Sequence, residues 1–124
     1  MVMTNNERVG RGLDAVRDGI RPACEMAWSA KYGEAGWLDE VHSRDKGALG
    51  SPDPNDLSWL LKGMQNTWQE VWRYRLSQSE RAFSGELREF RNRWAHQDQF
   101  STDDTYRTLD TAERLLAAFS AGEQ

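Results

Sequence analysis

Hydrophobic residues recur at helical spacing in four segments of the chain, and no segment shows the alternation of a half-buried strand. The first helix is predicted to begin at Thr4, because Thr4 and Glu7 have the spacing of a capping box. Its apolar positions are Val9, Leu13, Val16, Ile20, Ala23 and Ala27. Pro22 lies inside this pattern and predicts a kink or a division of the helix.

Residues 33–55 contain several glycines and prolines and a charged middle, which predicts one long loop between the first and second helices. The second helix is predicted to begin near Asp53–Asp56, a capping sequence with a proline suited to a first turn, and to end near Leu76. Its apolar stripe is Leu57, Leu60, Leu61, Met64, Trp68, Val71 and Trp72.

The third helix is predicted to begin at Ser77 or Ser79, and the fourth at Ser101, where Asp104 completes a cap. Their apolar positions are Phe83, Leu87, Phe90 and Trp94, followed by Leu109, Ala112, Leu116 and Phe119. Four amphipathic helices predict an all-α fold, a four-helix up-and-down bundle.

Six tryptophans divide into two groups. Trp68, Trp72 and Trp94 fall on apolar stripes, so we expect them in the core. Trp28, Trp37 and Trp59 are less determined, since they can cover the open side of the bundle or stack on a base.

Length and composition indicate one globular domain over residues 1–124, with a net charge of −4 and no broad basic surface for nucleic acid. No apolar run is long enough to cross a membrane, and the N-terminus lacks a secretory signal. The single cysteine, Cys24, favours a cytosolic location. One cysteine and two distant histidines make no zinc set, so we expect no metal, and we assign His42 to solvent.

The stretch "EFRNRWAHQDQF", Glu89 to Phe100, concentrates polar chemistry at the end of the third helix. On a helical wheel Asn92 and His96 face away from the apolar stripe, on the same side as Arg81, Ser84, Gly85 and Arg88. That side is either an ordinary solvated face or a small site for phosphate.

Arg91 and His96 are five residues apart, hence about 140° apart on an ideal helix. The two side chains of one regular helix therefore cannot easily bind the same small group. Either the helix unwinds near Ala95, or two copies of the chain meet along this face and complete one another's site.

"RNRWAH", Arg91 to His96, resembles the R-x4-6-H motif of the HEPN superfamily, with the polar residue that usually follows the arginine present as Asn92. The wider chain is similar to a HEPN subfamily found in a nuclear RNA-surveillance endonuclease and in large bacterial ATPases of phage defence. The segments that carry this likeness are "NNERVGRGLDAVRDGIRP", "DLSWLLKGMQNTWQEVW" and "ELREFRNRWAHQDQFSTDDTYRTLDTAERLL".

The resemblance implies a metal-independent endoribonuclease that needs no cofactor. The 2′-hydroxyl of RNA attacks the neighbouring phosphate, leaving a 2′,3′-cyclic phosphate and a 5′-hydroxyl. His96 would move protons, Arg91 would stabilise the charged phosphorane, and Asn92 would bind phosphate or orient His96. Arg88, Arg81 and Arg93 are expected RNA contacts. HEPN dimers commonly pair their motif helices, so we predict a homodimer through the Arg88–His96 face.

A second reading assigns the chain to a different class, a HEPN-like module that dimerises or binds RNA or nucleotide without cutting. The acidic net charge favours it. The chain stops at "FSAGEQ", soon after the last helix, as a domain excised from a larger ATPase or nuclease would. A fused or associated ATPase is therefore an expected partner.

Overall fold

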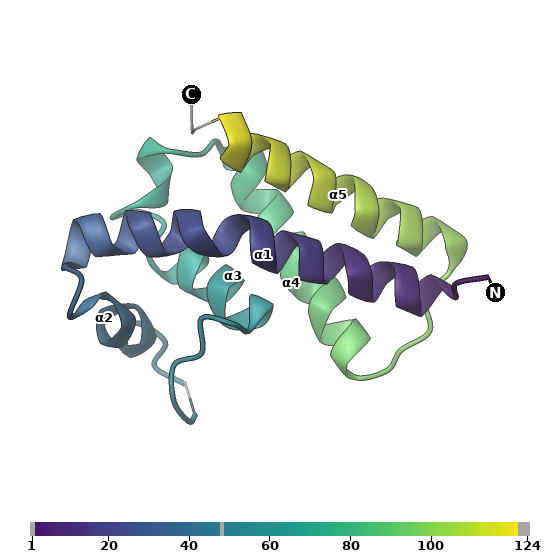
Figure 1. Ribbon diagram of the computed structural model, residues 1–124, viewed down its shortest axis with the longest axis horizontal. Helices are drawn as coiled ribbons and strands as arrows, with labels where there is room; N and C mark the ends of the chain where they lie inside the picture. The colour runs from purple at the N-terminus through teal and green to yellow at the C-terminus, as the bar shows by residue number, and fades with distance from the viewer. Residues whose placement is uncertain (1, 48, 122–124) are drawn as a thin grey trace.

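The computed structural model describes residues 2–47 and 49–121, and within these ranges the chain is all-helical, with no strand (Figure 1). The elements in order are α1 (Asn5–Tyr32), α2 (Trp37–Ser43), α3 (Leu57–Asn66), the 3₁₀ helix η1 (Trp72–Tyr74), α4 (Gln78–Ala95) and α5 (Thr102–Ala121). The all-α prediction is confirmed.

The helix starts lie where the capping residues predict them, because a cap depends only on neighbouring residues. Four side chains accept a hydrogen bond from a backbone N–H of the following turn: Thr4, Asp56, Ser77 and Ser101. At Ser77 the bond is reciprocal, since Glu80 accepts from the Ser77 N–H at 3.0 Å and completes a capping box.

Helices α1 and α5 run side by side in the same direction (Figure 1). Leu109 of α5 lies against Gly12, and Leu116 lies against Gly19 seven residues further along both helices. A Cβ at either glycine would come within 2.6 Å of the leucine, so the two glycines permit this close approach. The arrangement differs from the predicted up-and-down bundle, in which the first and last long helices would be antiparallel.

The core is built around Trp28, which is fully buried in the middle of a tryptophan cluster. Its ring lies 5.9 Å from that of Trp37, 5.7 Å from that of Trp59 and 5.9 Å from that of Trp72, centroid to centroid. The indole N–H groups of Trp28 and Trp72 both donate to the hydroxyl of Thr67. The less determined tryptophans therefore cover the bundle and are packed into or against the core.

Two predicted boundaries are wrong. The loop predicted over residues 33–55 contains α2, whose Val41 is buried. The helix predicted to end near Leu76 ends at Asn66, and turns with η1 replace its second half. Pro22 does not divide α1, which is continuous from Asn5 to Tyr32.

His42 of α2 is not the solvent histidine that was predicted. Its Nδ1 accepts a hydrogen bond from the Trp59 indole at 3.0 Å, so its Nε2 carries the proton and donates to the Gly50 carbonyl, also at 3.0 Å. The ring thus fastens α2 to α3 and to the segment that leads into α3.

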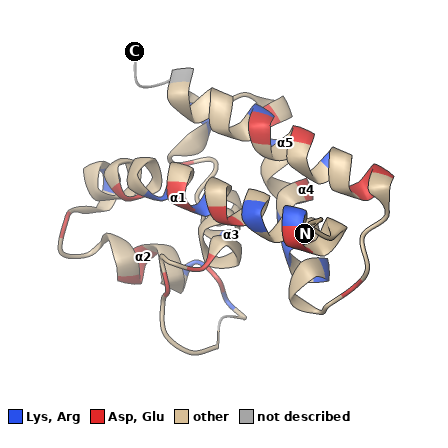
Figure 2. Cartoon of the chain, turned by 45° about the vertical axis from the view of Figure 1, so that its right-hand side comes forward, with Lys and Arg blue, Asp and Glu red and all other residues tan. Residues whose placement is uncertain are grey.

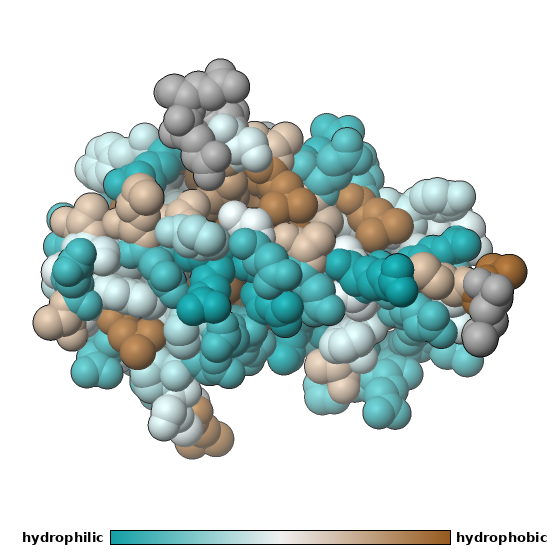
Figure 3. Space-filling model, in the orientation of Figure 1, coloured by the Kyte–Doolittle hydropathy of each residue, from teal (hydrophilic) through white to brown (hydrophobic). Residues whose placement is uncertain are grey.

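The surface carries both signs of charge. Acidic and basic residues are interspersed along α1 and α5 in Figure 2. The face drawn in Figure 3 is mainly hydrophilic, with hydrophobic residues showing between α1 and α5. Among the described residues, none of the helices has the length and apolar character needed to span a bilayer.

Candidate functional site

The last turn of α4 ends in a motif that holds His96 at the helix terminus. The N–H of Gln97 donates to the Trp94 carbonyl at 3.0 Å, and the N–H of Asp98 donates to the Arg93 carbonyl at 3.1 Å. These two bonds form a Schellman motif. Gln97 occupies the left-handed position, at φ 62°, where glycine is usual. The side chain of His96, the C-cap residue, is exposed.

The N-terminus of α1 holds this turn in place. The Asn6 side chain donates to the Asp98 carbonyl at 2.8 Å and accepts from the Phe100 N–H at 3.0 Å. Asn5 donates to the Phe100 carbonyl at 3.1 Å. The segment that follows His96 is therefore fixed by residues more than 90 positions earlier in the chain.

Arg91 projects from α4 toward the start of α3. Its Nη2 lies 3.1 Å from Oδ1 of Asp56, and both side chains are half-buried. The same Asp56 oxygen accepts from the Ser58 N–H and so caps α3. The Asp56 carboxylate thus caps α3 and also holds Arg91 in position.

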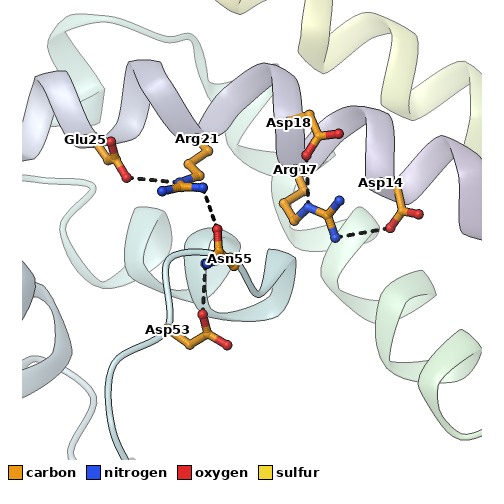
Figure 4. A network of polar contacts seen from close by, with 7 residues as sticks. All are labelled: Asp14, Arg17, Asp18, Arg21, Glu25, Asp53 and Asn55. Carbon is orange, nitrogen blue, oxygen red and sulfur yellow. Dashed lines mark hydrogen bonds and ion pairs between the residues drawn. The ribbon is translucent and has the colours of Figure 1, made fainter.

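A hollow of about 360 Å³ opens beside Arg91, between α1, the segment preceding α3, and α4. We call it the Arg91 hollow; its lining includes Leu13, Arg17, Asp56, Arg91 and Trp94. Figure 4 shows Asp14 and Arg17 reaching from α1, and Asp53 and Asn55 coming from the segment before α3. Arg17 is paired with Asp14 and Asp18, at 3.4 and 3.0 Å.

The predicted polar side of α4 is only partly a solvent face. Ser84 is fully buried and accepts a hydrogen bond from Gln65 of α3. Arg81 donates to the same Gln65 at 3.2 Å and lies over the Trp68 ring. The N-terminal half of this side therefore packs partly on α3, with Arg81 half-buried.

The other predicted RNA contacts have structural neighbours. Arg93 pairs with Asp104 of α5 at 3.0 Å, and its guanidinium lies 4.6 Å from the centre of the Phe100 ring. Arg88 is half-buried, and its Nε is buried with no hydrogen-bond partner among the described residues. Asn92 is half-buried, and its carbonyl accepts from the His96 N–H.

Within one copy the structure brings Arg91 to Asp56 and leaves His96 apart. No hydrogen bond or ion pair joins Arg91 to His96 in the described part of the chain. One of the two alternatives was that the helix unwinds near Ala95. Helix α4 does end at Ala95, but among the described residues no hydrogen bond or ion pair joins the Arg91 and His96 side chains there.

Two groups outside the site, Cys24 and Asp45, have shifted pKa values that arise from burial and from local pairing. Burial raises the pKa of the Cys24 thiol, which makes it a poor nucleophile. A hydrogen bond from Lys62 lowers the pKa of Asp45, with the Gly47 N–H and the charges of Lys62 and Arg88 acting in the same direction. Residues 2–47 and 49–121 hold no group of three His, Cys, Asp or Glu side chains arranged for a metal ion.

Comparison with known families decides the assignment. Residues 11–120 match the family model described as Swt1-like HEPN. The chain belongs to this family. HEPN domains are generally ribonuclease-like or RNA-binding. No curated protein and no solved structure matches this HEPN chain.

Apart from Arg91, none of the residues that line the Arg91 hollow of this HEPN domain was predicted at the site, among them Arg17, Asp56 and Trp94. Trp94 was expected in the core and is 40% exposed. Each residue could be placed on a helix face from the sequence. The helix against which that face packs depends on contacts between segments distant in the sequence, which the sequence alone does not give.

Proposed function

We propose that this HEPN domain is a metal-independent endoribonuclease that acts as a homodimer. One His96 accepts the proton of an RNA 2′-hydroxyl, and the freed oxygen attacks the adjacent phosphorus. The bond from phosphorus to the 5′-oxygen breaks, and that oxygen takes a proton from a water molecule, whose hydroxide is neutralised by the proton that His96 accepted. The products are a 2′,3′-cyclic phosphate and a 5′-hydroxyl.

Arg91 and Asn92 serve the phosphate in this proposal. The guanidinium of Arg91 is permanently charged and planar, which suits the doubly charged phosphorane. Asn92 can donate an amide hydrogen bond without adding charge. Arg88, with its buried Nε, Arg81 and Arg93 lie along the same helix and are proposed to contact the RNA backbone.

The observation that carries the proposal is the exposed His96 at the end of α4, one and a half turns after Arg91, in a domain of the HEPN family. Because no hydrogen bond or ion pair joins His96 to Arg91 within the described part of a copy, we infer that a second copy brings an imidazole to a guanidinium. Along α4 the positions Ala82, Gly85, Glu89, Asn92 and His96 repeat at alternating spacings of three and four, which is the spacing of a helix-pairing seam.

A second candidate function is binding without cleavage, in which the module dimerises a larger ATPase or senses RNA. The Arg91–Asp56 ion pair favours dimerisation without cleavage, because a carboxylate already occupies part of the guanidinium that an RNA phosphate would need. In either case we place the domain in the cytosol, in a phage-defence or toxin-like system.

Labelled RNA incubated with the protein in EDTA tests the proposal. Cleavage with cyclic-phosphate ends is expected from the wild-type protein and is lost in His96→Ala and in Arg91→Ala. Arg114→Ala is the matched control, because Arg114 is an exposed arginine on α5 whose partner Asp110 is on the same helix. Cleavage that survives either site change contradicts the assignment of that residue to the site. Absence of cleavage across several RNAs by a stable dimer contradicts catalysis and favours the binding module.

A further inference from the structure

The Arg91 hollow has an apolar floor and an aromatic wall. Leu13 of α1 and Leu57 of α3 line it and are 4% and 5% exposed, while Trp94 of α4 is 40% exposed. Its volume of about 360 Å³ is in the range of about 300–1,000 Å³ that small-molecule sites occupy. A flat ring system with apolar faces and a polar edge matches such a lining.

The indole of Trp94 is held in one orientation. Its Nε1 donates to the Asn6 carbonyl at 3.0 Å. The ring also lies directly against Gly10 of α1, where an added Cβ would come within 2.9 Å of it. A tryptophan fixed from two sides loses little conformational entropy when a ligand stacks on it, which is the property of a stacking platform.

The charges in the hollow favour a base over a second phosphate. The lining holds two guanidiniums, of Arg17 and Arg91, and three carboxylates, of Asp14, Asp53 and Asp56, so its formal charge is −1. Carboxylates repel phosphate but accept hydrogen bonds from the N–H groups of a base edge. Asp14 and Asp53 are exposed and line the hollow, Asp14 from α1 and Asp53 from the segment before α3 (Figure 4).

Resting on the proposed function, we propose that the Arg91 hollow is a subsite for an unpaired nucleobase of the RNA. The base stacks on Trp94, while the phosphate of a neighbouring nucleotide is held at Arg91, three residues earlier on the same helix. Guanine fits best, because its adjacent N1–H and N2–H₂ donors can both bond to one carboxylate, whereas uracil offers only one such N–H.

Nuclear magnetic resonance of the six tryptophan indole N–H groups tests this proposal, with Trp94 assigned from its variants. On titration with guanosine monophosphate the Trp94 signal is expected to shift, and the apparent affinity for uridine monophosphate is expected to be about 10-fold weaker. Trp94→Leu removes binding, and Trp94→Tyr, which keeps an aromatic face, retains part of it. Gly10→Ala, which pushes a methyl group into the indole, weakens binding.

The double variant Asp14→Asn with Asp53→Asn should lose the guanine preference, whereas Asp110→Asn on α5 should keep it. The subsite is refuted if guanosine monophosphate leaves the Trp94 signal unchanged while shifting others, or if the double variant keeps the full preference. His96→Ala separates the two proposals, because it should abolish cleavage while leaving nucleotide binding intact. Nucleotide binding without any RNA cleavage would refute only the proposed catalysis; cleavage without a Trp94 response would refute only the subsite.

Discussion

The guanidinium of Arg91 on α4 and the carboxylate of Asp56 at the start of α3 lie 3.1 Å apart, Nη2 to Oδ1. The pair brings together the arginine of the HEPN motif and a helix cap 35 residues earlier in the chain. An RNA phosphate that binds Arg91 must share the guanidinium with this carboxylate. Asp56 therefore orients Arg91 and also competes with the substrate.

Asp56→Asn is expected to strengthen RNA binding several-fold. Asparagine is as good a helix cap as aspartate and keeps the oxygen that accepts from the Ser58 N–H, so α3 should remain intact. The lost charge frees Arg91 for phosphate. Fluorescence anisotropy with labelled RNA at fixed salt measures the effect, and Asp110→Asn is the control for a simple change in net charge. Weaker binding by Asp56→Asn would show that Asp56 serves only to position Arg91.

Asn6→Ala is expected to lower the free energy of unfolding by about 1–3 kcal/mol, because it removes two hydrogen bonds to the segment after His96. Urea denaturation measures this loss. Asn66→Ala, at an exposed position at the end of α3, is the matched control. RNA cleavage should also decline, since the turn that carries His96 loses its anchor. Wild-type stability in Asn6→Ala would mean that these bonds do not hold the turn.

Gln97→Gly is expected to stabilise the domain by about 1 kcal/mol. Gln97 lies at φ 62°, and a left-handed conformation costs a residue with a Cβ roughly 1–2 kcal/mol, part of which the greater flexibility of glycine in the unfolded chain offsets. Thermal and urea unfolding check the sign. Gln99→Gly, at an exposed position in the same loop, should give no gain. A destabilised Gln97→Gly protein would contradict the Schellman geometry.

Glu86→Gln tests the pH dependence of the contact between α4 and α5. A hydrogen bond from Arg107, together with Thr111 and the charge of Arg107, lowers the pKa of Glu86 in the folded protein. A lowered folded pKa adds stability above the unfolded pKa of about 4.3, and this stability is lost as the pH falls through the folded value. The free energy of unfolding of the wild-type protein should exceed that of Glu86→Gln by at most about 1 kcal/mol at pH 7, because Arg107 is largely exposed.

Urea unfolding at neutral and acidic pH measures that difference, which should shrink toward acid. Glu113→Gln, an exposed position on α5, supplies the comparison. A difference that stays constant with pH would show that the Glu86 carboxylate does not stabilise the fold through its charge.

Local features of the fold were predictable, and contacts between distant segments were not. The caps at Thr4 and Ser101 follow from neighbouring residues and are confirmed. Ser77 is one of the two predicted starts of α4, and Asp56, at the end of the predicted capping stretch, is the cap of α3, so Pro54 lies outside that helix. By contrast, α2 is short and glycine-flanked, and it is held by contacts such as the one between His42 and Trp59. Its periodicity alone does not distinguish it from a loop.

The same distinction between local features and distant contacts holds for the candidate site. A helical wheel correctly turns His96 away from the core, but it does not show that Ser84 meets Gln65 or that Trp94 meets Gly10. Nor does it show where Asp56 lies. Partners on other helices decide whether a polar residue is free for a ligand.

Mixing two inactive variants tests the central claim most directly, that Arg91 of one copy acts with His96 of another. Arg91→Ala and His96→Ala are each expected to be inactive, while an equal mixture, allowed to exchange subunits, should regain about a quarter of wild-type cleavage. That fraction arises because half of the dimers are mixed and each has one intact site of two. A mixture that stays inactive, although native mass spectrometry shows mixed dimers, would contradict the shared site.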